Sequence, residues 1–390
     1  MVNGSGINLS VFLCCEMVLF WLFVLAVAIQ VGYAMYFFVR IFSLPGKNGL
    51  LPSAGQQPVS IIICAKNEAV KLKKNLPALL AQKYFNSAGI VNYEVVVVND
   101  ASTDNSTDVL KELQLQYDNL VVVTIPLGTE RNAPGKKYAL SVGVAHAKCD
   151  WLLLTDADCA PVSNSWLERM TAPLANGKEI VAGYGGYRKM PGLLNAFTRW
   201  ETIHAFLQYS TYTLAGRPYM AVGRNMACIK STLQKAQQSG IWKALLSGDD
   251  DLLVRVAGNA HNTAIVCDEM AFTYTESKTT WAEWARQKQR HLSTGKYYKM
   301  GIKWLLGIYG ASHTVMWLGM VILLFTSYWL PVLALMGIRC VAYWLLWSVT
   351  AGKLREKSLI YLFPLFDVGW MIYNFVFFPY ITWKNKQQWK

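Results

Sequence analysis

Residues 151–158 read Trp-Leu-Leu-Leu-Thr-Asp-Ala-Asp, an apolar run that ends in two aspartates. Four consecutive apolar residues before the acids predict a buried strand over 151–154. Carboxylates just beyond such a strand suit a divalent cation held against a diphosphate, because hard cations prefer oxygen ligands. A helix cap or a turn is the alternative explanation of an Asp-x-Asp that stands alone.

Short apolar runs alternate with segments of helical periodicity over residues 58–278. The runs at 59–63, 94–98 and 120–125 predict strands, and the segments 72–82 and 136–147 predict helices. Ser102 or Asp104 could cap a further helix that runs to about Tyr117. Such alternation with fully apolar strands predicts an α/β domain whose mostly parallel sheet is covered on both faces. Ligands of open α/β sheets bind beyond the carboxyl ends of the strands. We therefore expect Glu68, Asp100 and Asp156/Asp158 to converge on one edge.

Asp100 suits the nucleoside end of a ligand, since a carboxylate accepts hydrogen bonds from uracil N–H or ribose hydroxyls. A simple strand-to-helix turn would also explain it. Lys136 and Lys137 follow Pro134-Gly135 at a predicted helix start. They either face phosphate oxygens or form a solvated pair of charges, and the sequence favours neither.

Asp249-Asp250-Asp251 precedes an apolar run and is expected at a helix N-terminus, where the dipole favours carboxylates. Three adjacent carboxylates repel one another, which raises the pKa of one of them and suits a general base near neutral pH. Asp250 is the candidate base, with Asp249 beside it. Simple N-capping is the alternative.

Residues 279–301 contain a basic, tryptophan-bearing stretch that predicts an amphipathic helix at a membrane interface. Gln287 and Arg290 share one face of that helix because they are three residues apart. Trp281 and Trp284 are expected in the headgroup zone. A plain membrane anchor would also explain the pattern.

The chain has 390 residues, is 53% hydrophobic and carries a net charge of +13. It is too apolar for a typical cytosolic enzyme, and its basic residues gather beside the apolar segments, as attraction to an anionic membrane face predicts. Neither zinc-finger spacing nor an RNA-binding fingerprint supports a nucleic-acid partner. The eight cysteines form no CxxC pair and fit a reducing compartment.

Apolar stretches predict one transmembrane helix over 9–42 and three within 302–382, at about 302–325, 329–350 and 359–382. Basic clusters follow the first, precede the second and follow the third. They predict a multi-pass protein of the cell membrane with its soluble domain in the cytoplasm, although the basic tail after 382 disagrees. Arg339 and Asp367 lie at comparable depth, so we expect an ion pair, either as a staple between helices or along an acceptor path.

Taken in order, Asp100, Asp156-Ala157-Asp158, Asp249-Asp250 and the stretch from Gln287 to His291 resemble the motifs of membrane-bound family 2 glycosyltransferases, which have a GT-A fold. The likeness runs from about residue 59 to 296. Residues 247–250, Ser-Gly-Asp-Asp, are especially similar to hyaluronan and chitin synthases. His291 stands where that family usually has tryptophan, which weakens an expectation of polymer synthesis.

The resemblance implies a role for each of these motif residues. Asp100 would contact the nucleoside, Asp158 with Asp156 would serve Mg²⁺ or Mn²⁺ and the diphosphate, and Asp250 would be the base. The full set of nucleotide-sugar candidates is Glu68, Asp100, Lys136, Asp156, Asp158, Gln287 and Arg290. Residues 222–225 resemble the family's acceptor-side loop, so the acceptor candidates are Arg224, Asn225 and His291.

The resemblance also implies the reaction, an inverting transfer of sugar from a nucleotide-diphosphate sugar, in the first place a UDP-sugar, to a lipid or membrane-associated hydroxyl. Four membrane segments are few for a polysaccharide channel, which favours a single transfer to lipid. A processive synthase of the chitin or hyaluronan kind is the alternative, and a non-catalytic nucleotide-sugar sensor is a further one. A partner subunit stays open.

Overall fold

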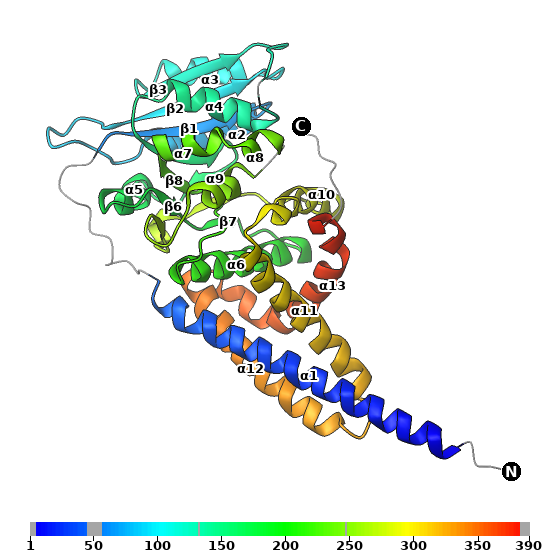
Figure 1. The fold of residues 1–390 in the computed structure, drawn as a ribbon. Coiled ribbons are helices and arrows are strands. Elements are labelled where there is room, and N and C mark those ends of the chain that lie inside the picture. The colour runs from blue at the N-terminus through cyan, green and yellow to red at the C-terminus, as the bar shows by residue number, and fades with distance from the viewer. Residues whose placement is uncertain (1–4, 45–56, 132, 246–247, 383–390) are drawn as a thin grey trace. The chain divides into compact units, whose positions relative to one another are not determined.

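The computed structural model describes residues 5–44, 57–131, 133–245 and 248–382. These residues form two compact units (Figure 1). The α/β unit comprises the chain between Ser43 and Tyr298, together with the C-terminal residues after Pro379. The membrane unit combines the helix before Ser43 with the helices between Lys299 and Pro379.

A mixed sheet of seven strands organises the described part of the α/β unit, in the order β3-β2-β1-β4-β8-β6-β9. Strands β1, β2, β3 and β4 are mutually parallel, whereas β8 is antiparallel to both β4 and β6. The strands are β1 (Val59–Ala65), β2 (Tyr93–Asp100), β3 (Leu120–Ile125), β4 (Trp151–Asp156), β6 (Ile180–Ala182), β8 (Met226–Ile229) and β9 (Thr263–Ile265). The expectation of a mostly parallel sheet is confirmed.

Helices cover both faces of this sheet. Leu72, Leu76 and Trp166 pack on one face, and Ala139 packs against Val98 on the other. The helices are α2 (Ala69–Leu80), α3 (Ser106–Gln114), α4 (Lys136–His146), α5 (Trp166–Ala175), α6 (Leu193–Leu214), α7 (Lys230–Gln237), α8 (Gly240–Ala244), α9 (Asp249–Ala257) and α10 (Trp281–Leu292). A small second sheet joins β5 (Ala160–Pro161), β10 (Thr273–Thr275) and β7 (Gly185–Tyr187).

Ser102 or Asp104 was expected to cap a helix that runs to about Tyr117, whereas α3 begins at Ser106, has Asn105 at the cap position and ends at Gln114. Asp104 lies before it and accepts hydrogen bonds from the backbone N–H of Ser106 and from that of Ala69, both at 3.0 Å. The carboxylate thus ties the starts of α3 and α2 together. A link between residues 35 apart leaves no trace in local periodicity.

Four helices of the membrane unit, counted over the described residues, are long and apolar enough to cross a membrane. They are α1 (Ser5–Phe42), α11 (Met300–Leu323), α12 (Trp329–Lys353) and α13 (Phe363–Thr382), the last preceded by a short 3₁₀ helix over Lys357–Leu362. Helix α1 packs against α11 and α12 through Phe23, Met316 and Val332. The prediction of one N-terminal and three C-terminal segments is confirmed, and the basic tail lies outside the described residues.

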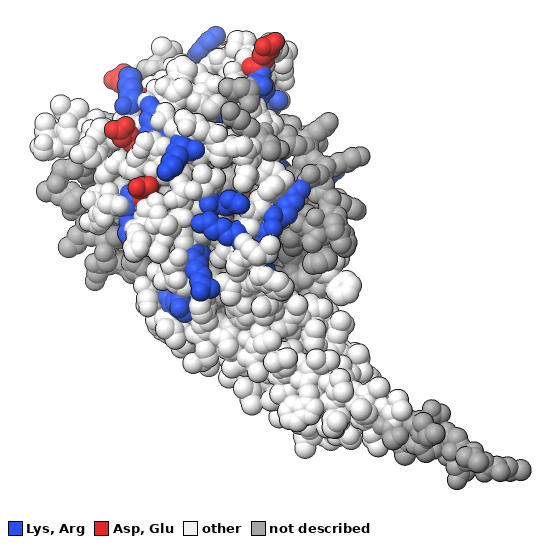
Figure 2. Space-filling view, in the orientation of Figure 1, with Lys and Arg blue, Asp and Glu red and all other residues white. Residues whose placement is uncertain are grey.

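The outer surface of these helices is apolar. On the face drawn in Figure 2, the described residues of the membrane helices are white over much of their length, with neither the blue of Lys and Arg nor the red of Asp and Glu. Trp21 and Trp304 are more than half exposed, as suits side chains that contact lipid. These features support membrane association of the chain.

The predicted ion pair between Arg339 and Asp367 is confirmed. The Arg339 guanidinium donates to both carboxylate oxygens of Asp367, with Nη2 at 2.9 Å from Oδ1. Asp367 also accepts from Trp317 Nε1 at 3.1 Å and lies 3.2 Å from His313 Nε2, while Arg339 donates to Gln30 Oε1 at 3.2 Å. Because Gln30 lies on α1 and His313 on α11, the buried network joins all four helices.

Candidate active site

Two of the predicted acids lie at the ends of strands that flank β1. Asp100 is the last residue of β2 and Asp156 the last of β4, and both strands pair in parallel with β1. The carboxyl ends of the three strands therefore meet at one edge, as the sequence predicted. Asp158 follows two residues beyond Asp156.

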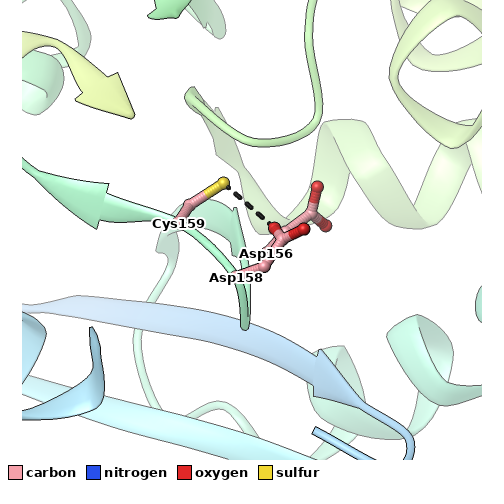
Figure 3. A group of neighbouring side chains, drawn as sticks. All are labelled: Asp156, Asp158 and Cys159. Carbon is pink, nitrogen blue, oxygen red and sulfur yellow. Dashed lines mark hydrogen bonds between the residues drawn. The ribbon is translucent and has the colours of Figure 1, made fainter. Parts of the chain in front are cut away.

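Asp156, Asp158 and Cys159 form one cluster, whose oxygen and sulfur atoms lie within 4.8 Å of one another (Figure 3). The Cys159 thiol donates to Asp158 Oδ1 at 3.4 Å. Burial raises the pKa of this thiol well above its usual value, which favours the neutral thiol in the metal-free site. The carboxylates that remain fit Mg²⁺ or Mn²⁺.

Each strand-end acid is paired with a cation, one from the segment before α4 and one from the first residue of α4. Arg131 clamps Asp100, with Nη2 at 2.6 Å from Oδ1 and Nη1 at 3.1 Å from Oδ2, and Asp100 is completely buried. Lys136 pairs with Asp156. Arg131 was not among the predicted site residues, although its place between the third strand and the Pro-Gly turn was a usable signal.

Lys137 and Glu68, two other residues predicted near the nucleotide sugar, contact the protein itself. Lys137 is completely buried and donates to the carbonyls of Trp242 and Leu245, so neither the phosphate-facing nor the solvated interpretation was right. Glu68 lies just before α2 and pairs with Lys71 of that helix at 2.8 Å. Its backbone N–H donates to the Ser106 hydroxyl at 3.1 Å, which joins the β1–α2 turn to α3.

The acidic triplet begins α9, as predicted, but its members differ. Asp250 accepts from the backbone N–H of Gly223 at 2.7 Å and from that of Asp251 at 2.9 Å. Burial, and then the neighbouring charge of Asp249, raise the pKa of Asp250 to about 6. Such a group is ionised at neutral pH and can still take up a proton, which suits a general base.

Asp251 serves a structural purpose. Its buried carboxylate accepts from the Thr294 hydroxyl at 2.7 Å and from the Tyr298 hydroxyl at 2.8 Å. It thereby fastens α9 to the segment after α10. Gly248, just before the triplet, has φ +80°, and a Cβ there would lie 2.2 Å from Thr294 Cγ2. Ser247 of the predicted motif lies outside the described residues.

The candidate acceptor loop holds Asp250 but uses much of its own polarity internally. Arg224 Nε donates to the carbonyl of Gly185 at 2.8 Å, and the guanidinium lies 4.8 Å from the centre of the Tyr187 ring. Asn225 is completely buried: it accepts from Trp166 Nε1 and donates to the carbonyls of Tyr184 and Ala271. Asn225 is thus a core residue, and the prediction that it contacts the acceptor was wrong.

Helix α10 faces the same edge. Gln287 Nε2 lies 3.5 Å from the Tyr187 hydroxyl, which also accepts from Arg224 at 3.4 Å. Burial opposes the ionisation of Asp156, but Lys136, Arg224 and Arg290 outweigh it and lower the pKa of Asp156. Because Tyr187 contacts both Gln287 and Arg224, it belongs to the candidate site, although it was not among the predicted residues. His291 is exposed.

Helix α10 is anchored to the protein itself. Lys288 is buried and pairs with Glu201 of α6. Trp284, only 5% exposed, packs against Phe197 at 5.6 Å between ring centres, while Trp281 is 50% exposed. The expectation that Trp284 anchors in lipid headgroups was wrong, because its ring fills a space beside α6.

An α/β sheet with paired strand-end carboxylates and a perturbed acid beyond them fits a glycosyltransferase of the GT-A type. Comparison with known families agrees. The model described as Glycosyl transferase family 2 matches residues 60–231, and that described as Glycosyl transferase family group 2 matches residues 151–365, more than half of the chain. The chain belongs to the family 2 glycosyltransferases, enzymes that use nucleotide sugars.

Individual relatives are more distant. The chain is 26% identical over 249 residues to the probable glycosyltransferase YdaM of Bacillus subtilis, covering 61% of this chain but only 55% of that protein. It is 25% identical over 355 residues to the uncharacterized glycosyltransferase YaiP of Escherichia coli, covering 84% of each. Mannosyltransferase PcManGT of Pyrobaculum calidifontis, solved with GDP-Man and Mn²⁺, shares the fold at a TM-score of 0.54 and 16% identity, covering 92% of this chain and 98% of that one.

Proposed function

We propose that this enzyme transfers one sugar, with inversion, from a UDP-sugar to the hydroxyl of a membrane lipid. The single observation that carries the proposal is Asp250: its carboxylate is held by two backbone N–H groups and has a pKa of about 6. The catalytic domain spans residues 58–278, the helix within 279–301 completes the site, and 302–382 crosses the membrane. We place the catalytic domain on the cytoplasmic side of the cell membrane, following the basic clusters.

Each remaining candidate has a role in this proposal. Asp100 accepts from the nucleoside, and Lys136, Gln287 and Arg290 face the diphosphate. Asp156 and Asp158 hold Mg²⁺ or Mn²⁺, which when bound neutralises charge on the leaving nucleotide. Arg224 and His291 line the acceptor side, and Glu68 borders the nucleotide.

The transfer is a single displacement. An oxygen of Asp250 takes the proton of the acceptor hydroxyl, whose oxygen forms a bond to the anomeric carbon. The bond from that carbon to the diphosphate oxygen breaks, and its electron pair leaves with the nucleotide diphosphate. One displacement inverts the anomeric centre, so no covalent sugar–enzyme intermediate forms.

The names of short matches include both a lipid glycosyltransferase and a polysaccharide synthase. Residues of this chain are 31% identical over 124 residues to beta-monoglucosyldiacylglycerol synthase of Nostoc, a quarter of that protein. They are 27% identical over 131 residues to poly-beta-1,6-N-acetyl-D-glucosamine synthase of Staphylococcus epidermidis, 28% of that protein. Four candidate spans favour the lipid, and a polysaccharide synthase is the second candidate.

The test is release of nucleotide diphosphate by the full chain in lipid nanodiscs, over UDP- and GDP-sugars with Mg²⁺ or Mn²⁺. We expect turnover that chelation abolishes, that Asp250→Asn reduces by about 10²- to 10⁴-fold, and that Asp150→Asn leaves unchanged. Asp150 is an exposed acid just before β4, at the opposite end of that strand from Asp156.

Mass spectrometry of the product separates the candidates. One sugar on a lipid supports the proposal, and a ladder of sugars supports the polysaccharide synthase. Binding of a sugar nucleotide without turnover, in the presence of native lipids, would instead support the non-catalytic sensor.

A further inference from the structure

The first turn of α4 reaches two parts of the candidate site at once. Lys136 pairs with Asp156, whereas Lys137, the next residue, extends to the end of α8. Its Nζ donates to the carbonyl of Leu245 at 2.8 Å and to that of Trp242 at 3.1 Å, and it lies 5.2 Å from the centre of the Trp242 ring. Neighbouring side chains on a helix point in directions about 100° apart. The first turn of α4 therefore contacts both Asp156 and the segment before α9.

The two carbonyls lie at a point where the backbone has no helical partner for them. Helix α8 ends at Ala244 and α9 begins at Asp249. Carbonyls at a helix C-terminus need outside donors, and a cation is favoured there. Lys137 supplies both the hydrogen bonds and the charge, from a completely buried side chain.

Helix α9, which carries Asp250, therefore has one anchor in the chain before it and another within its first turn. Lys137 holds the chain before it, at Leu245, and Asp251 holds it from within through Thr294 and Tyr298. A carboxylate that must meet an acceptor hydroxyl depends on such anchors, because small displacements of a base are costly in rate.

We propose that Lys137 is a positioning residue, which holds the end of α8 and Leu245, shortly before α9 begins, so that Asp250 meets the acceptor hydroxyl beside the donor. The inference rests on the proposed function, in which Asp250 is the base. Lys137 acts through backbone carbonyls and touches neither substrate.

The positive charge of Lys137 also favours the ionised form of Asp250. Burial lowers the pKa of Lys137 to about 8, against the opposing effect of Asp249 and Asp250, so the ammonium form dominates at neutral pH. The charged groups near Asp250 are Asp249 and Asp251 on its own helix and Lys136 and Lys137 on α4. Loss of the Lys137 charge should raise the pKa of Asp250.

The experiment compares Lys137→Met, Lys137→Arg and Lys230→Met with wild type, all as full chains in nanodiscs. Lys230 is the matched control: it begins α7 and its Nζ donates to the carbonyl of Ala147 at 2.7 Å. We expect Lys137→Met to lower kcat about ten- to a hundred-fold with KM for the UDP-sugar nearly unchanged. The acid limb of kcat should move to higher pH, Lys137→Arg should restore most of kcat, and Lys230→Met should behave as wild type.

A wild-type kcat and pH profile in folded Lys137→Met would overturn the inference. So would an equal loss in Lys230→Met, a change confined to KM, or a loss that merely follows the fraction of folded protein in a thermal melt. The proposed function is tested first and separately. A wild type without turnover, or an Asp250→Asn variant that keeps it, defeats that function and the role of Lys137 with it.

Discussion

Asp250 should set the pH dependence of the reaction. A base must be ionised to accept a proton, and the pKa of Asp250 is raised to about 6, so kcat should fall as the pH drops through about 6. The negative charge of Asp249 contributes to that rise. Asp249→Asn should therefore lower the pKa of Asp250 and move the acid limb of a kcat–pH profile to lower pH. An unmoved limb would assign it to another group.

Gly248 should tolerate no side chain. Its φ of +80° and the 2.2 Å approach of a Cβ to Thr294 combine strain with a clash. Gly177 has φ +78° and nothing within 4 Å of a Cβ, so Gly177→Ala should cost only the backbone strain, about 1–3 kcal/mol. We expect a larger loss of unfolding free energy, and a lower kcat, for Gly248→Ala. Equal melting temperatures for the two variants would contradict the clash.

At the scale of elements, α10 depends on one buried ion pair. Lys288 and Glu201 are 7% and 13% exposed, and loss of one partner leaves an uncompensated charge. Lys288→Met should cost about 3–5 kcal/mol in unfolding free energy, and the double change with Glu201→Leu should recover most of it. Lys74, in a pair with Glu276 whose side chains are both more than half exposed, is the control: Lys74→Met should cost at most about 1 kcal/mol. Denaturant titration of each variant measures these differences.

The elements themselves were largely predictable. The limits of β3 agree with the predicted 120–125, and α4 and α9 begin where the Pro-Gly turn and the acidic triplet predicted. Periodicity, turn residues and strand-end acids are all local signals, readable within about ten positions. Asp104 was one of the two expected caps of α3, but it lies one residue before the cap position and also bonds across to α2, which no local signal indicates. Trp284 was misread because its packing partner, Phe197, lies on another helix.

At the scale of the whole molecule, the membrane unit relies on a charged network that joins its helices. Arg339→Met leaves Asp367 and its donors without their main partner in an apolar setting, which is costly. We expect this variant to melt well below wild type in nanodiscs, and Arg339→Met with Asp367→Met to melt higher than either single change. Arg40→Met, at the end of α1, is the control.

The activity of the double variant then decides the purpose of the network. A folded double variant with normal transfer supports a staple between helices. A folded double variant without transfer supports a role along the path of the acceptor.

The sequence by itself determined the α/β class, the four candidate spans, the converging acids and the pairing of Arg339 with Asp367. Each depends on residue type, spacing and order along the chain. Only the tertiary structure decided which buried polar groups satisfy one another. Arg131 closes on Asp100, Asn225 supports the core, Tyr187 joins Arg224 to Gln287, and Lys137 holds the approach to Asp250. These partners are distant in sequence, and a buried donor or acceptor is satisfied by whatever the fold brings beside it.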